Sequence, residues 1–127
     1  MYCLDTNIVI AFLRGDTVVV DKINSVGGSV CITWLTVCEL YRGVFLSSQV
    51  ESNTTQLNRF LESTKIIAFS RTACELYGQL YAKLKSKGKP TQDIDLLIGA
   101  LCIAHGKTLV TRNVKDFVIP DLKTISW

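Results

Sequence analysis

Short apolar and β-branched stretches recur along the chain, and the stretches between them have apolar residues at a helical spacing. The short stretches predict five strands, at residues 2–4, 29–32, 66–69, 109–111 and 124–126. Parallel neighbours in a sheet need crossovers of about a dozen or more residues, and helices fill that role here. The alternation therefore predicts an α/β fold in which helices cover both faces of a central parallel sheet of four to five strands.

The most regular helix is predicted at residues 73–84, where apolar side chains recur at positions i, i+3 and i+4. A basic last turn at Lys85 and Lys87, a stop at Gly88 and a break at Pro90 are expected to end it. Further helices are predicted near residues 18–23, 57–61 and 96–104. The last of these is apolar nearly all round, so we expect it to be buried.

The length and composition predict a single domain over residues 1–127. The chain is 48% apolar and 20% charged, as in ordinary globular proteins, and it has no linker-like tract. Its longest apolar run, at residues 96–104, is nine residues long, whereas a membrane-spanning helix needs about 20. The first residues do not resemble a signal peptide. We therefore expect a soluble, cytoplasmic protein with no membrane partner.

Cysteine and histidine usage narrows the possible chemistry. The five cysteines are odd in number, form no Cys-x-x-Cys pair and mostly lie in apolar runs, so we expect buried small side chains rather than disulfides or a zinc site. His105 is the only histidine, which excludes mechanisms that need two. We interpret it as a polar residue at the end of a helix.

The acidic residues stand at the positions that a parallel sheet uses for its ligands. Asp5 directly follows the first predicted strand, where such a sheet has its binding edge. Asn7 is expected to cap the helix that comes next. A purely structural use of Asp5 and Asn7, as turn and cap residues, is the alternative.

Glu39 follows the second predicted strand at the start of a helix. With Thr36 it fits a capping box, which is a structural alternative to catalysis. Its apolar neighbours favour a functional role, since a carboxylate in that setting is costly without a compensating cation or donors.

Two more acids, Asp93 and Asp95, begin the buried helix at residues 96–104. Acids at a helix start usually cap it or interact with its dipole, and Asp93 fits the cap. Asp95 is therefore the better candidate ligand.

The loop after the fourth predicted strand contains Thr111, Asn113 and Asp116. It follows the end of a strand, as Asp5 and Glu39 do. Four carboxylates, those of Asp5, Glu39, Asp95 and Asp116, are therefore expected to meet in one pocket.

Such a pocket would need a cation. Two carboxylates about 4 Å apart repel by roughly 4 kcal/mol at an effective dielectric near 20. Hard oxygen ligands favour Mg²⁺, with Mn²⁺ as the alternative, and these ions also bind phosphate oxygens. Water activated by one or two such ions can attack a phosphodiester, so the set predicts a metal-dependent nuclease.

The charge balance agrees with a polyanionic substrate. The net charge is +3, but without the four acids 14 basic residues face only seven acidic ones. That lysines simply keep a small protein in solution is the alternative.

Four segments in this order resemble the PIN-domain ribonucleases of the VapC toxin type. They are Leu4-Asp5-Thr6-Asn7, Thr36-x-x-Glu39-Leu40-x-x-Gly43, Asp95-Leu96-x-Ile98-x-Ala100 and Thr111-x-Asn113-x-x-Asp116-Phe117, and the chain ends in Trp127. Each segment is short, but the ordered set covers nearly the whole chain and is specific.

The resemblance implies a three-layer α/β/α PIN fold and Mg²⁺-dependent RNA cleavage that arrests translation. It also implies dimerisation and neutralisation by a VapB-type antitoxin. By position, Asp5 and Asp95 match the principal metal ligands and Glu39 the third acid, while either Asn113 or Asp116 completes the site. Gly99 stands where these toxins commonly have alanine, which we interpret as a variation in packing.

Three other functions are compatible with parts of this pattern. A PIN nuclease of RNA processing would have the same site without the toxin role. A catalytically silent PIN domain is disfavoured because every acid is present. A response-regulator receiver is disfavoured because Phe69-Ser70-Arg71, after the third predicted strand, contains no aspartate.

Overall fold

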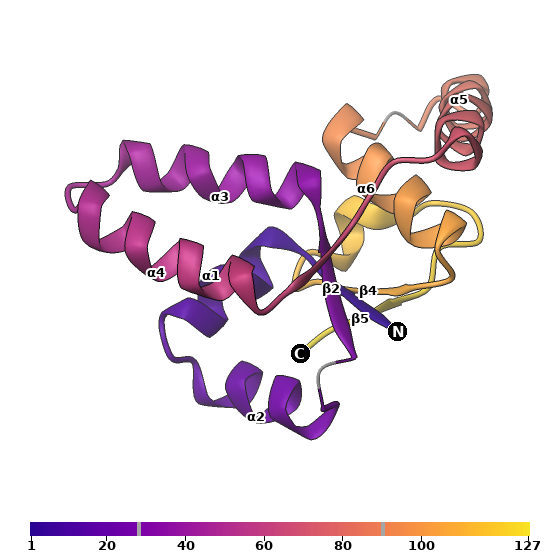
Figure 1. The fold of residues 1–127 in the computed structure, drawn as a ribbon. Coiled ribbons are helices and arrows are strands. Elements are labelled where there is room, and N and C mark those ends of the chain that lie inside the picture. Colours follow the sequence, from indigo (N-terminus) through magenta and orange to yellow (C-terminus); the bar gives the residue numbers. More distant parts are fainter. Residues whose placement is uncertain (28, 90) are drawn as a thin grey trace.

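Five parallel strands form the centre of the molecule (Figure 1). The computed structural model describes residues 1–27, 29–89 and 91–127. The strands are β1 (Tyr2–Leu4), β2 (Val30–Thr33), β3 (Lys65–Ile67), β4 (Thr108–Val110) and β5 (Thr124–Ile125). Their order across the sheet is β3-β2-β1-β4-β5, and each neighbouring pair is parallel. The predicted parallel sheet is confirmed.

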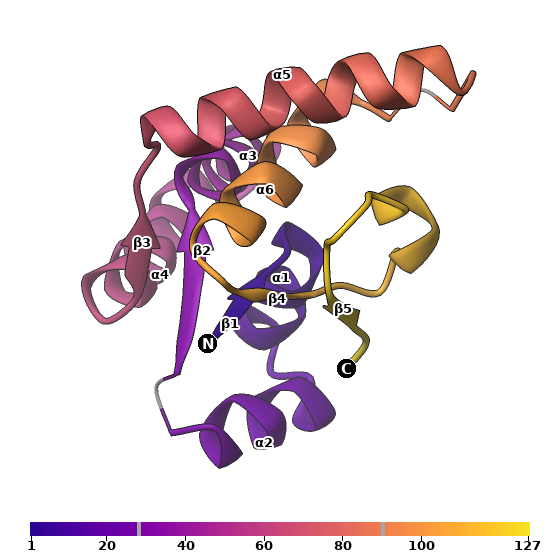
Figure 2. The same ribbon diagram turned by 90° about the vertical axis from the view of Figure 1, so that its right-hand side faces the viewer.

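Helices cover both faces of this sheet. They are α1 (Thr6–Leu13), α2 (Thr17–Ser25), α3 (Trp34–Leu46), α4 (Val50–Glu62), α5 (Arg71–Ser86), α6 (Asp93–Ala104) and the short 3-10 helix η1 (Val114–Phe117). Figure 2 shows α5 and α6 on one side of the strands, with α1 and α2 on the other. The arrangement is the predicted three-layer α/β/α fold.

Alternation along the strands creates the two cores. Cys3, Cys31 and Leu109 pack with the buried residues of α5 and α6. The residues that follow each of them, such as Leu4, pack with α1, α3 and α4. Because successive side chains of a strand point to opposite faces, these short strands supply both cores.

The third strand lies earlier than the sequence predicts. It ends at Ile67 rather than at Phe69, and Phe69 is exposed. The cause is the start of α5, where the Ser70 hydroxyl accepts a 3.2 Å hydrogen bond from the Ala73 amide. At its other end α5 stops as expected, with Gly88 at a φ of 63°. The predicted break at Pro90 lies outside the described residues.

The cysteine prediction is only partly right. Cys3, Cys31 and Cys102 are buried, but Cys38 and Cys74 are exposed, because they lie on outward faces of α3 and α5. His105 follows the last residue of α6, as predicted, and its Nε2 lies 3.0 Å from the Ala68 carbonyl oxygen.

Gly99 allows a close approach to α6. A Cβ at this position would lie 2.7 Å from Cδ1 of Ile119 and 3.4 Å from Cδ2 of Leu122. Its role is thus in packing, as the sequence indicated. Among the residues that the structure describes, no helix has the length and apolar character to cross a membrane.

Candidate active site

The candidate acids lie near the edge where the parallel strands end. β1 and β4 are neighbours, with Leu4 opposite Val110. The Asp5 amide continues this pairing with a 2.9 Å hydrogen bond to the Val110 carbonyl oxygen. The residues that follow β1 and β4 are therefore held side by side at the sheet edge.

Asp5 is buried, with 6% of its surface exposed, and both its carboxylate oxygens accept hydrogen bonds. Oδ1 accepts from the Thr6 amide and Oδ2 from the Thr111 hydroxyl, each at 2.8 Å. Burial raises the pKa of Asp5, the two hydrogen bonds oppose that rise, and the charges of Glu39 and Asp116 add to it.

Asp5 is also the N-cap of α1, so the predicted cap at Asn7 is wrong. The helix begins at Thr6, which leaves Asn7 exposed inside its first turn. Asp5 therefore caps a helix and also carries a buried charge beside the other acids. From the sequence, a structural and a functional role for this residue were alternatives.

Glu39 reaches the same region from the second turn of α3. The Thr6 hydroxyl donates to its Oε1 at 2.7 Å, and the Arg42 guanidinium lies 3.5 Å from its Oε2. The structural alternative, a capping box with Thr36, is wrong, because the residue that caps α3 is Thr33, whose hydroxyl accepts from the Thr36 amide at 3.1 Å. Glu39 therefore has no part in capping α3.

Asp95 lies in the first turn of α6 and is partly buried. Burial raises its pKa to about 6, with further contributions from the charges of Asp5, Asp116 and Glu39. The sequence suggested that Asp93 caps α6, and this is wrong. The N-cap position is Gln92, and Asp93 instead accepts a 2.8 Å hydrogen bond from the Tyr77 hydroxyl, which joins α6 to α5.

Asp116 and Asn113 have different surroundings, although they share one loop. Asp116 belongs to η1, and its side chain lines a hollow together with Asp95. Asn113 precedes η1, and its backbone N–H donates to the Thr111 hydroxyl at 3.0 Å. The charge of Asp116 acts on both Asp5 and Asp95.

Two supporting contacts have no signature in the sequence. Thr6, which joins Glu39 to the start of α1, looks like an ordinary first residue of a helix. Arg112 binds Asp16 at 2.9 Å and the Trp127 carbonyl oxygen at 3.0 Å, and so fastens the loop after β4. Asp16 and Arg112 are 96 positions apart, so no local spacing reveals their contact.

The donor set suits a hard divalent cation. In the described part of the chain, no three Asp, Glu, His or Cys side chains stand close enough together to enclose a metal ion. Mg²⁺ does not need such a cage, because it usually keeps several waters and uses one or two carboxylates. Burial is the main cause of the raised pKa values of Asp5 and Asp95, and the charges of neighbouring acids add to it, so a bound cation would offset part of the cost.

Comparison with known proteins places this geometry in a family. The PIN domain family model matches residues 2–118. Ribonuclease VapC2 of Rickettsia felis is 35% identical over 131 residues, which cover 100% of this chain and 98% of that protein. The tRNA(fMet)-specific endonuclease VapC of Shigella flexneri is 28% identical, with 99% of this chain and 97% of that protein covered.

Solved structures agree with these relatives. The crystal structure of VapBC2 from Rickettsia felis, bound to a DNA fragment from their promoter, contains a chain with a TM-score of 0.92 and 33% identity. The match covers 99% of this chain and 98% of that one. The chain therefore belongs to the PIN-domain family and is a nuclease of its VapC ribonuclease group.

Proposed function

We propose that the chain is a Mg²⁺-dependent endoribonuclease and the toxin of a VapBC pair, built as one domain over residues 1–127. The observation that carries the proposal is the placement of acids from separate segments: Asp5 caps α1, Glu39 accepts from the Thr6 hydroxyl beside it, and Asp95 and Asp116 line one hollow. Asp95 has a raised pKa because it is buried near Asp5, Asp116 and Glu39. PIN-domain VapC nucleases are metal-dependent in general, and the all-oxygen donor set favours Mg²⁺, or Mn²⁺ in its place.

The four acids have different roles in this proposal. Asp5 and Asp95 are the principal metal ligands, because they match these ligands of the family by position and the charge of Asp5 acts on Asp95. Glu39 is the third acid. Asp116 completes the set in preference to Asn113, because Asp116 shares a hollow with Asp95 whereas Asn113 braces Thr111 through its backbone.

The bound cation would supply an activated water for attack on the phosphodiester and neutralise charge on the leaving oxygen. The chain's own residues prepare the site for this. Thr111 and the Thr6 amide hold the Asp5 carboxylate at both oxygens, and the Thr6 hydroxyl orients Glu39. Preorganised groups of this kind need not rearrange during the reaction.

An RNA substrate and a VapB-type antitoxin are the proposed partners. The relatives are named as ribonucleases, and one is named for its action on tRNA(fMet). A largely apolar groove borders Glu39 between α1, α3 and α4, with Ile10, Leu40 and Leu57 among its lining residues. An antitoxin segment bound there would lie next to the acids. We further propose a homodimer in the cytoplasm.

The test is cleavage by the purified chain. We expect it to cut an initiator tRNA transcript or total cellular RNA with Mg²⁺, and to stop when a chelator is added. Asp5→Asn and Asp95→Asn should lose activity with unchanged circular dichroism. If both variants cleave like the wild type, the proposed site is wrong. Arrest of growth on brief induction, relieved by a neighbouring antitoxin gene, separates a toxin from an RNA-processing nuclease.

A further inference from the structure

A hollow beside two of the acids is lined by cations as well. It lies between the end of α5, the start of α6 and η1, and it has a volume of about 340 Å³. Asp95 and Asp116 line it together with Lys89 and Lys115. Its size is within the range of small-molecule sites, roughly 300 to 1,000 Å³, so it can hold part of a nucleotide.

The two lysines do not neutralise the acids that share their hollow. The described part of the chain has two ion pairs, Arg42–Glu39 and Arg112–Asp16. Lys89 and Lys115 belong to neither, and both are exposed. Their ammonium groups are therefore available to a ligand that carries negative charge.

A second hollow continues from the first along η1. Lys89 and Val118 line both hollows, and the second also includes Lys87. Val118 is 68% exposed although it is apolar. In Figure 2 the end of α5 and the segment that contains η1 lie on the same side of the molecule. The route away from Asp95 and Asp116 is thus bordered by Lys87 and Lys89, while the other residues that line the second hollow are mostly apolar.

We propose that Lys89 and Lys115 bind RNA phosphates next to the cleaved bond, and that the strand leaves the acids along these two hollows. The inference rests on the proposed function and names part of its substrate-binding surface. Alternating acids and cations suit this role, because the acids serve the metal while ammonium groups attract the neighbouring phosphates. An antitoxin segment is less suited to the first hollow, because charged and polar residues line it, whereas the groove beside Glu39 is largely apolar.

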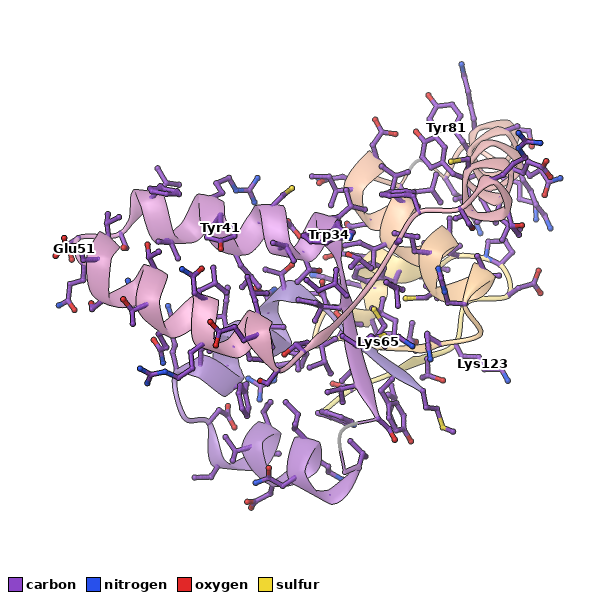
Figure 3. The ribbon with its side chains drawn as sticks, in the orientation of Figure 1. Trp34, Tyr41, Glu51, Lys65, Tyr81 and Lys123 are labelled. Carbon is purple, nitrogen blue, oxygen red and sulfur yellow. The ribbon has the colours of Figure 1, made fainter. Side chains whose placement is uncertain are left out.

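The experiment compares two double variants with the same change in net charge. Lys89→Gln with Lys115→Gln removes the proposed contacts. Lys22→Gln with Lys65→Gln is the control. Lys22 lies in α2, across the strands from α5 and α6 (Figure 2), and Lys65 begins β3 (Figure 3), and neither residue lines either hollow. Both pairs consist of exposed lysines, so neither change should unfold the protein.

Binding is measured first, by fluorescence anisotropy with a labelled single-stranded oligoribonucleotide in Mg²⁺, in the Asp5→Asn background. We expect the Lys89/Lys115 variant to bind on the order of tenfold more weakly, with a salt dependence shallower by about 1.4, or about 0.7 for each lost phosphate contact. The control pair should bind within about twofold of its parent, as expected for distant, screened charges. The proposal is overturned if RNA binding is weakened equally in both double variants, or if it is weakened in neither.

Steady-state cleavage of an initiator tRNA transcript gives a second readout in the otherwise wild-type chain. KM should rise and kcat should stay within about twofold, because the lysines bind substrate without entering the chemistry. A loss of kcat at unchanged KM overturns the proposal, as does unchanged RNA binding together with weaker binding of a co-expressed antitoxin. The anisotropy result does not depend on cleavage, so a failure of the proposed function is recognised separately, by the absence of cleavage in the wild type.

Discussion

The Thr111 hydroxyl donates a 2.8 Å hydrogen bond to Oδ2 of Asp5, although 106 positions separate the two residues. The contact exists because β1 and β4 are neighbours in the sheet. Thr111 has no exposed surface, so water cannot replace its hydroxyl without a rearrangement. It is a positioning residue for the acid that anchors the site.

Thr111→Val should move the acidic limb of the pH–activity profile to higher pH. The hydrogen bond from Thr111 lowers the pKa of Asp5 against the effect of burial, so its loss makes the carboxylate harder to ionise. The change also removes the acceptor of the Asn113 amide, and we expect a loss of about 1 to 3 kcal/mol in the free energy of unfolding. Thr64→Val is the control, because it removes a partly buried hydroxyl that donates to the Phe60 carbonyl oxygen at the end of α4, outside the hydrogen bonds of Asp5. A limb that moves equally in both variants would exclude the proposed role.

Asp5→Asn and Asp5→Ala should differ in stability while both lose activity. Asparagine is also a good N-cap and removes a buried charge, so the metal-free Asn variant should be at least as stable as the wild type. Alanine removes the cap of α1, at a cost of about 1 kcal/mol, and leaves the Thr111 hydroxyl without its acceptor. Thermal unfolding of the three proteins in the presence of a chelator checks this order of stabilities. Equal melting temperatures would show that the cap contributes nothing.

The stability of the metal-free protein should fall as the pH rises through the range in which Asp95 ionises. The pKa of Asp95 is raised from 3.8 to about 6 in the folded chain. Between these values the folded state keeps a proton that the unfolded state has released, so the stabilisation is present at the acidic end and is lost above about pH 6. Asp95→Asn should show a flatter profile in thermal unfolding with a chelator. If stability depends on pH in the same way in the wild type and in Asp95→Asn, the raised pKa of Asp95 is contradicted.

Glu39→Gln should weaken metal binding with little change in stability. Glu39 does not cap α3, and glutamine keeps an oxygen that can accept from the Thr6 hydroxyl. Thr6→Val, by contrast, should keep the charge of Glu39 but lose its orientation, which raises the Mg²⁺ concentration at half-maximal activity. Mg²⁺ titration of activity separates the two effects. A large loss of stability in Glu39→Gln would indicate a structural role instead.

Mg²⁺ should stabilise the wild type and have much less effect on Asp95→Asn. A ligand at about 100 times its Kd stabilises the folded state by about 2.7 kcal/mol if it binds only that state. The shift in melting temperature between chelator and saturating Mg²⁺ measures this, and Mn²⁺ serves as the comparison ion. An equal shift in Asp95→Asn would place the cation elsewhere.

The sequence alone predicted the parallel sheet, the long helix that becomes α5 and its stop at Gly88, because apolar periodicity and glycine signals are local properties of the chain. It also predicted that Asp5 and Asp95 lie near one edge, since acids that follow strands or begin helices gather where parallel strands end.

Only the tertiary structure decided how the side chains meet. It placed the cap of α1 at Asp5 rather than Asn7, joined Thr6 to Glu39, and put Lys89 into one hollow with Asp95. The contact between Thr6 and Glu39 depends on the strand order β3-β2-β1-β4-β5, which brings β1, before α1, beside β2, before α3. A strand's periodicity shows which face is buried but not which strand lies next to it, so contacts between distant segments follow from the packing of the whole sheet.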